Sequence, residues 1–242
     1  VHPVEHKNYT EHLALQKFPE PDTVIIPLAM HIGAPANPVV QPGDSVKVGQ
    51  LIGEQAGFIS APVHSSVSGT VVAVEPHTHP NKGPGVMSVV IRNDKKNVLH
   101  ESVVPNKPLE ELTPDEIVEI VKQKGIVGMG GAMFPTAFKI RGGLGKVDTL
   151  IINGAECEPY LNGDHWTMKL YPEELLKGIE LARIASGLEK AYYGIEKNKM
   201  DAIELLNSKN PAQYGVEIVP EDVKYPQGAE KMQIKAITNR EV

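Results

Sequence analysis

Three glycines within four positions mark residues 128–139, which read GMGGAMFPTAFK. Gly128, Gly130 and Gly131 carry no Cβ, so the backbone can approach a flat or phosphorylated ligand closely. Lys139 adds a positive charge to the same segment. No G-K-S or G-K-T follows the glycines and no predicted strand precedes them, so the segment is neither a Walker loop nor a dinucleotide fingerprint. Considered alone, it fits an ordinary turn as well as a ligand-binding loop.

An acidic loop is the second candidate segment, because residues 153–165 read NGAECEPYLNGDH directly after an apolar run. Glu156 and Glu158 carry carboxylates, which accept hydrogen bonds from ribose hydroxyls in other nucleotide sites. A solvated acidic loop explains this segment alone at least as well. Since the two segments bracket one predicted strand, residues 149–153, we expect them to meet at one ligand site. Cys157 is interpreted as a loop residue rather than a catalytic thiol.

The composition is typical of a globular protein, with 41% hydrophobic and 22% charged residues in a chain of 242. A net charge of −6 without a cluster of Lys and Arg argues against nucleic acid as a partner. No apolar run approaches the roughly 18 to 20 residues of a membrane span, and no signal-peptide pattern opens the chain. The single cysteine fits a reducing, cytoplasmic compartment. The chain starts without Met and stops soon after a predicted helix, so we expect a trimmed protein.

The first half of the chain predicts an arm, a β-rich domain and a linker. Residues 1–22 lack periodicity, and their histidines match no metal-ligand spacing, so we expect a solvated arm and no metal site. Residues 23–94 hold short β-rich runs between Gly and Pro, and they resemble the biotinyl/lipoyl-type barrel-sandwich hybrid fold. The hairpin at residues 54–60 contains no carrier lysine, which indicates a structural or docking role. Residues 95–112 are polar and are predicted to be a linker.

The second half, residues 113–242, predicts a Rossmann-like α/β domain with a mostly parallel sheet. Its first helix carries the start signal of a capping box, with Thr113 as N-cap and Glu116 three positions later. Predicted strands then alternate with predicted helices up to Thr238. Such sheets bind ligands at the carboxyl ends of their strands, so the loops there are the expected site. The fold class is therefore α/β, with an all-β domain leading a Rossmann-like one.

Together the two segments resemble a known family. GMGGAMFPTAFK followed by LIINGAECEPYLNGDH is similar to the flavoprotein, NADH-binding subunit of respiratory complex I. The closer resemblance is to the C subunit of the Rnf-type ion-translocating electron transport complex, and it covers nearly the whole chain. Further stretches that carry it are IPLAMHIGAPANPVVQPGDSVKVGQ, PVHSSVSGTVVAVEPH, GIEKNK and YPQGAEKMQIKAIT. We expect this chain to be such a subunit, truncated before its iron–sulfur region.

The resemblance implies cofactors and residue roles. FMN would accept electrons from NADH, and two [4Fe-4S] clusters outside this chain would carry them onward. No residue is predicted to be catalytic, because the flavin supplies the redox chemistry. Two departures from the complex I pattern, Met133 for Gly and Ala155 for Asp, put the shape of the nucleotide pocket in doubt. The residues that the resemblance places at the cofactor and nucleotide are Gly128, Gly130, Gly131, Phe134, Lys139, Asn153, Glu156 and Glu158.

The whole protein is then expected to relay electrons in an NADH:ferredoxin oxidoreductase coupled to Na⁺ or H⁺ translocation. Its partners would be the other subunits of that complex and, indirectly, ferredoxin, at the cytoplasmic face of the bacterial membrane. This fragment alone is expected to be inactive and to bind FMN weakly or not at all. Two alternatives stay open. One is a related flavoprotein carrier, such as a proline-reductase-associated carrier or a cobalamin reductase, and the other is a non-catalytic scaffold or docking module.

Overall fold

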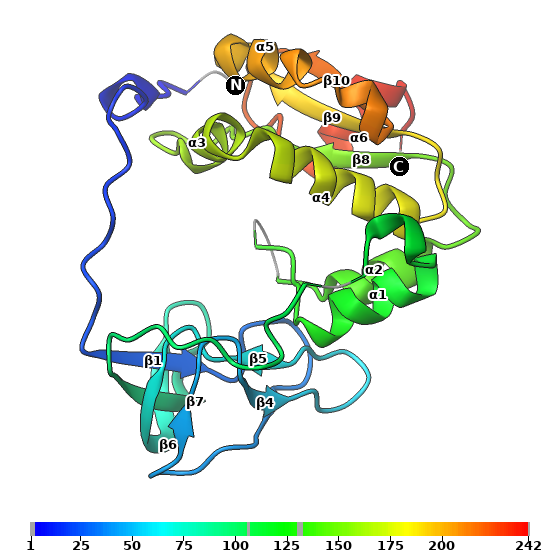
Figure 1. The fold of residues 1–242 in the computed structure, drawn as a ribbon. Helices are drawn as coiled ribbons and strands as arrows, with labels where there is room; N and C mark the ends of the chain where they lie inside the picture. The colour runs from blue at the N-terminus through cyan, green and yellow to red at the C-terminus, as the bar shows by residue number, and fades with distance from the viewer. Residues whose placement is uncertain (1–2, 106, 130–132, 242) are drawn as a thin grey trace. The chain divides into compact units, whose positions relative to one another are not determined.

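The computed structural model describes residues 3–105, 107–129 and 133–241 (Figure 1). Its contacts divide the chain into two compact units. The first combines residues 1–17 with residues 143–242, and the second consists of residues 18–142. This grouping differs from the expected boundaries in two places. Residues 1–17 of the expected arm group with the α/β unit, and residues 113–142 group with the β-rich unit.

Antiparallel strands build the unit of residues 18–142. In its described part, one sheet has the order β1-β7-β6-β3 and a second has the order β2-β4-β5. The strands are β1 (Thr23–Pro27), β2 (Asn37–Pro38), β3 (Ser45–Val46), β4 (Leu51–Glu54), β5 (Val63–His64), β6 (Gly69–His79) and β7 (Gly83–Asn93). The long β6 and β7 pair with each other, so they form the scaffold on which the shorter strands assemble. This architecture confirms the expected all-β domain.

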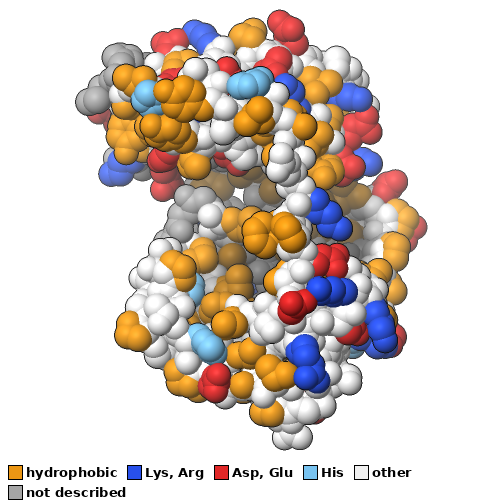
Figure 2. All heavy atoms as spheres, turned by 90° about the vertical axis from the view of Figure 1, so that its left-hand side faces the viewer, with side chains coloured by type: hydrophobic (Ala, Val, Ile, Leu, Met, Phe, Trp, Pro, Cys, Tyr) orange, Lys and Arg blue, Asp and Glu red, His pale blue; other side chains and the backbone are white. Residues whose placement is uncertain are grey.

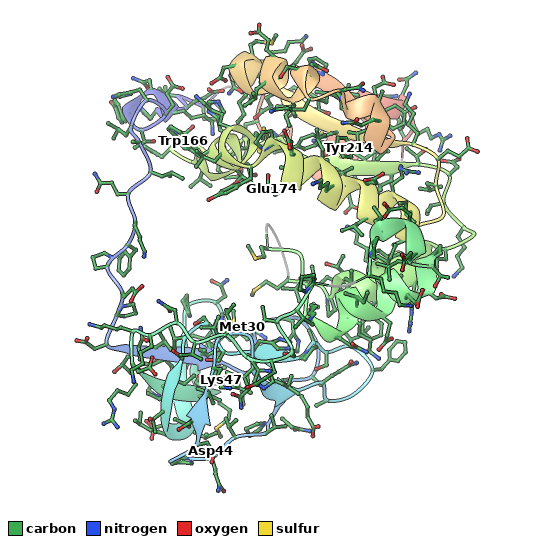
Figure 3. The ribbon with its side chains drawn as sticks, viewed as in Figure 1. Met30, Asp44, Lys47, Trp166, Glu174 and Tyr214 are labelled. Atoms are coloured by element: carbon green, nitrogen blue, oxygen red, sulfur yellow. The ribbon has the colours of Figure 1, made fainter. Side chains whose placement is uncertain are left out.

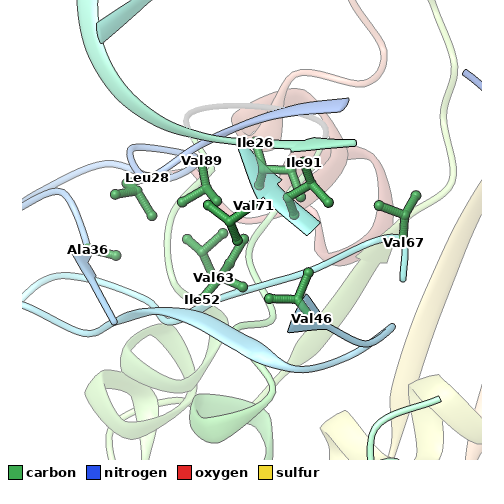
Figure 4. Close-up of a cluster of buried hydrophobic side chains, with 10 residues drawn as sticks. All are labelled: Ile26, Leu28, Ala36, Val46, Ile52, Val63, Val67, Val71, Val89 and Ile91. Carbon is green, nitrogen blue, oxygen red and sulfur yellow. The ribbon is translucent and has the colours of Figure 1, made fainter. Parts of the chain in front are cut away.

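A core of aliphatic side chains joins the strands of this unit (Figure 4). Leu28, Ile52 and Ile91 are fully buried within it. Burial of each such side chain contributes about 1.5 to 3 kcal/mol relative to exposure. At the hairpin where a carrier protein would present its lysine, Phe58 is 81% exposed. Its ring packs edge-on against Phe138 at 5.3 Å.

Two helices complete the same unit, together with the short 3₁₀ turn η2 (Leu109–Glu111). The predicted capping box of α1 (Pro114–Gln123) is confirmed. Glu116 donates its backbone N–H to Thr113 Oγ1 at 3.3 Å, and Thr113 donates its own to Glu116 Oε2 at 2.9 Å. Gly125 then ends the helix with a φ of 67°. The second helix, α2 (Thr136–Gly143), was not expected from the sequence.

A parallel sheet forms the centre of the other unit. In its described part, the sheet has the order β10-β9-β8, as expected for the Rossmann-like domain. The strands are β8 (Leu150–Asn153), β9 (Ala191–Glu196) and β10 (Val216–Glu221), and the helices are α3 (Gly163–Leu170), α4 (Pro172–Ala185), α5 (Met200–Ser208) and α6 (Glu230–Thr238). Short 3₁₀ turns occupy Lys7–Tyr9 (η1), Lys197–Lys199 (η3) and Pro211–Tyr214 (η4). The expected α/β fold class is confirmed.

The two faces of this sheet are covered by different helices. Tyr193 and Ile195 of β9 pack into a core with apolar side chains of α3, α4 and α5. Gly194 faces the opposite way, because successive strand residues alternate between faces. A Cβ on Gly194 would lie 2.9 Å from Gln233 Nε2 of α6. Helix α6 therefore approaches the opposite face closely, and glycine makes that approach possible.

None of the described helices is long and apolar enough to span a membrane. Figure 2 shows acidic, basic and hydrophobic side chains interspersed over one face of the molecule.

Candidate functional site

The carboxyl ends of the three parallel strands each carry a polar side chain. β8 ends at Asn153, β9 at Glu196 and β10 at Glu221. The register pairs Asn153 with Gly194 and Glu221 with Glu196, so these ends lie along one edge of the sheet. This is the edge at which open α/β sheets bind their ligands. We call it the carboxyl edge.

Two loops are tied together at the carboxyl edge. Asn153 donates its side-chain N–H to the carbonyl oxygen of Gly228 at 2.8 Å. The same side chain accepts the backbone N–H of Ala155 at 3.1 Å. A Cβ on Gly228 would lie 2.9 Å from the carbonyl oxygen of Ala155 and 3.3 Å from Cys157 Sγ. The loop after β8 and the loop after β10 can therefore approach this closely only with glycine at position 228.

Glu156 is the most constrained carboxylate of the predicted site, with only 6% of its surface exposed. Its backbone N–H donates to Glu196 Oε2 at 3.2 Å. Its Oε1 accepts the backbone N–H of Asp164, in the first turn of α3, at 3.0 Å. Its Oε2 is buried and has no hydrogen-bond partner among the described residues. Because buried carboxylate oxygens are normally hydrogen-bonded, this atom is suited to accept a bond from a ligand.

A buried ion pair lies beside Glu156 and was not predicted from the sequence. Glu196 and Lys199 are each 1% exposed, and Lys199 Nζ lies 3.4 Å from Glu196 Oε2. Lys199 Nζ also donates to Asn198 Oδ1 at 3.3 Å. The sequence signal that pointed to this pair is the segment GIEKNK at residues 194–199, one of the stretches that carry the family resemblance. Lys and Glu are almost never fully buried unless they are paired, so their residue types alone gave no sign of burial.

Burial raises the pKa of two further carboxyl groups at this edge. The pKa of Glu221 is raised by burial, although Gln233 Nε2 donates to its Oε2 at 3.0 Å. The pKa of Asp164 is raised by burial first and by the charge of Glu156 second. Burial therefore disfavours the charged form of these two carboxyl groups.

Cys157 and Glu158 occupy the middle of the acidic loop. Burial raises the pKa of the Cys157 thiol, and the neighbouring Glu158 carboxylate raises it further. The thiol donates a weak hydrogen bond to Glu158 Oε2 at 3.7 Å. A thiol with a raised pKa is a poor nucleophile at neutral pH. This supports the interpretation of Cys157 as a loop residue, while Glu158 presents an exposed carboxylate.

A cavity of about 50 Å³ opens at the same edge. Its lining residues are Pro3, Glu5, Cys157, Glu196, Val223, Lys224 and Tyr225. Cavities that enclose whole cofactors measure about 300 to 1,000 Å³. The cavity is thus large enough for one or a few atoms of a ligand.

The glycine-rich segment belongs to the unit of residues 18–142. Gly128 donates its N–H to the carbonyl oxygen of Phe134 at 3.0 Å, which closes the segment into a loop. Met133 has a φ of 54°, a conformation that glycine adopts more readily. Phe134 is 38% exposed, and Lys139 lies exposed on α2. The ring and the ammonium group are both accessible to a ligand.

The structure brings together three of the predicted site residues, Asn153, Glu156 and Glu158, in the α/β unit. Phe134, Lys139 and Gly128 belong to the β-rich unit. Gly130 and Gly131 lie outside the described residues. That the two segments form one site stays a prediction. Sequence reasoning did not select several residues that the structure places at the carboxyl edge, among them Glu196, Lys199, Glu221 and Gly228.

Two family models match the chain. Residues 1–96 match the RnfC barrel sandwich hybrid domain, and residues 121–242 match the Nuo51 FMN-binding domain. The second match contains both candidate segments, and residues 97–120 lie between the two matches.

Three curated relatives match the chain over its full length. The C subunit of the Na⁺-translocating ferredoxin:NAD⁺ oxidoreductase complex of Acetobacterium woodii is 46% identical over 243 residues, which are 55% of its length. The C subunit of the proton-translocating complex of Clostridium ljungdahlii is 42% identical, with 53% of its length covered. The C subunit of an ion-translocating oxidoreductase complex of Vibrio cholerae is 36% identical, with 31% covered. The chain therefore spans about half the length of the first two relatives and about a third of the last.

Among solved structures, an NAD⁺-reducing [NiFe]-hydrogenase in the air-oxidised state matches 50% of this chain and 23% of its own chain, with 32% identity and a TM-score of 0.48.

Proposed function

Since this chain belongs to the family of Rnf-type C subunits, with an RnfC barrel sandwich hybrid domain and a Nuo51 FMN-binding domain, we propose that it binds FMN and NADH at the carboxyl edge of β8–β10. The observation that carries this proposal is the buried Glu156 carboxylate, whose Oε2 has no partner among the described residues. Beside it, Gly228 has no Cβ, which lets the loop after β10 pack against Ala155 and Cys157 of the loop after β8. A buried acceptor without a partner fits a ligand that offers hydroxyl or N–H donors.

The protein's own residues would bind and orient the reactants. Asn153 holds the loop after β10 against the loop after β8, which fixes Gly228 in place. Glu156 and Glu158 would accept hydrogen bonds from ribityl or ribose hydroxyls. Phe134 would stack on a flat ring and Lys139 would contact a phosphate or the flavin. FMN, when bound, supplies the acceptor of the hydride that NADH gives up, so no acid–base pair of the protein is required.

We further propose that the whole subunit passes these electrons to iron–sulfur clusters. The single cysteine of this chain cannot supply the four thiolates of a [4Fe-4S] cluster, so the ligands would lie outside these residues. The relatives from Acetobacterium woodii and Clostridium ljungdahlii belong to ion-translocating ferredoxin:NAD⁺ oxidoreductase complexes. By that analogy, this protein would act with the other subunits of such a complex at the cytoplasmic face of the membrane, in a reaction coupled to Na⁺ or H⁺ transport.

Flavin titration of the full-length protein tests the proposal. Bound flavin should show quenched fluorescence and should be bleached when NADH is added. A Lys139→Ala variant should weaken binding, while Lys96→Ala, at an exposed position of the same unit, should not. A full-length protein without flavin binding would instead favour the scaffold interpretation.

A further inference from the structure

The beginning of the chain lies on the loop that carries the candidate ligand residues. Lys7, in η1, is only 6% exposed although it is a lysine. Its Nζ donates to the carbonyl oxygens of Glu158 at 3.1 Å and Leu161 at 2.5 Å. A buried ammonium group must have its donors satisfied, so these two bonds hold both partners in place. The ammonium of Lys7 thus connects residues that are far from it in the sequence.

Backbone and side-chain contacts strengthen this attachment. Tyr160 donates its backbone N–H to the carbonyl oxygen of Glu5 at 2.8 Å. The side-chain N–H groups of Asn162 donate to the carbonyl oxygen of Lys7 at 3.1 Å and to Thr10 Oγ1 at 2.8 Å. We call residues 5–10 the clamp segment. These contacts all join it to residues 158–162, which lie within the acidic loop and include the site residue Glu158.

The turn at Tyr160 keeps its conformation because surrounding residues hold it in place. Tyr160 has a φ of 68°, which residues other than glycine keep only when their surroundings enforce it. The ring of His6 stacks on that of Tyr160 at 5.0 Å with an angle of 17° between the planes. The clamp segment therefore supplies the surface against which the strained turn packs.

The charge of Lys7 also acts on the carboxylates of the site. Burial lowers the pKa of Lys7, and the ammonium of Lys199 lowers it further, whereas Glu156, Glu196 and Glu5 act in the opposite direction. The field of Lys7 thus reaches the carboxylates of Glu156 and Glu196. The Glu196 carboxylate also accepts the backbone N–H of Glu156.

We propose that Lys7 is a positioning residue for the nucleotide site. Its ammonium fixes the loop carbonyls of Glu158 and Leu161, and through them it sets the directions in which the carboxylates of Glu156 and Glu158 meet the ligand. The N-terminal segment is therefore a functional part of the α/β unit. This inference rests on the proposed function, because it requires that the loop after β8 contacts flavin and nucleotide.

The test uses the full-length protein in its purified complex, with the variants Lys7→Met, Lys7→Arg and Lys177→Met. Lys177 is an exposed lysine on α4 of the same unit and serves as the control. NADH oxidation with ferricyanide as acceptor gives KM and kcat separately. Lys7→Met should raise KM for NADH about tenfold and lower kcat less than about threefold, because ground-state positioning is lost. Lys7→Arg should recover part of the increase, and Lys177→Met should match the unaltered protein.

Hydrogen–deuterium exchange supplies a second readout. Protection should fall at residues 156–164 in Lys7→Met and remain elsewhere. If the unaltered complex shows no NADH-dependent flavin reduction, the proposed function fails and this inference falls with it. If that complex is active and Lys7→Met keeps an unchanged KM, the inference alone is overturned.

If Lys7→Met does not accumulate as folded protein, the variant Thr10→Val tests the inference instead. This change at an exposed position removes one acceptor from Asn162 and leaves Lys7 intact. A KM for NADH that rises about threefold corresponds to roughly the free energy of one hydrogen bond and supports the positioning role of the clamp segment. An unchanged KM overturns that role.

Discussion

Replacing Lys199 with methionine should destabilise the α/β unit strongly. The substitution removes the ammonium partner of Glu196, and both side chains are 1% exposed, so no water replaces it. Glu196 would retain only the backbone N–H of Glu156 as a donor at its Oε2. Removal of one partner from a buried ion pair costs about 3 to 5 kcal/mol, because the remaining charge is left without compensation. We expect a loss of that size in the free energy of unfolding.

Urea denaturation followed by tryptophan fluorescence measures this loss. Trp166, the single tryptophan, lies on α3 and therefore reports on this unit (Figure 3). The double variant Lys199→Met/Glu196→Gln should recover a large part of the stability, since it removes the uncompensated charge as well. Lys177→Met, at an exposed position, should stay within about 0.5 kcal/mol of the unaltered protein. A Lys199→Met variant that loses less than about 1 kcal/mol would refute the argument that the pair is buried and coupled.

Three further predictions follow from particular contacts. Gly228→Ala should lower the free energy of unfolding in urea by about 1 to 3 kcal/mol, because the new Cβ would lie 2.9 Å from the carbonyl oxygen of Ala155. An unchanged free energy of unfolding would contradict the close approach of the two loops. Ile52→Ala should cost about 2 to 5 kcal/mol and lower the midpoint of thermal unfolding, because Ile52 is fully buried in the β-rich core. The raised pKa of Glu221 means that its burial penalty is absent below about pH 4.5 and grows as the pH rises through the folded-state value. Glu221→Gln should therefore be more stable than the unaltered protein at pH 7 and no more stable at about pH 4, and equal stability at both pH values would count against the penalty.

Local signals predicted much of the secondary structure of both units. The capping box at Thr113 and Glu116 depends on residues three positions apart, so the sequence contains all of it. Apolar runs predicted the strands of the parallel sheet for the same reason. Helix α3 was missed because its sequence, GDHWTMKL, opens with glycine and lacks a clear apolar period. The short α2 was missed because it ends in two glycines.

The contacts of the site join residues that are far apart in the sequence, so only some of these residues could be predicted. Asn153, Glu156 and Glu158 were predicted because they follow an apolar strand directly. The contribution of Lys7 could not be predicted, since its hydrogen-bond partners, Glu158 and Leu161, lie 151 and 154 positions away. The arm was accordingly expected to be solvated, whereas the structure buries Lys7 against the acidic loop.

The central claim is that the carboxyl edge of β8–β10 binds the flavin through Glu156. FMN titration of the full-length protein, comparing Glu156→Gln with the exposed control Glu174→Gln on α4, tests it most directly (Figure 3). Loss of a hydrogen bond to a charged group costs about 1.5 to 3 kcal/mol, so Glu156→Gln should weaken FMN binding by at least about tenfold. Unchanged FMN affinity in folded Glu156→Gln protein would contradict the claim.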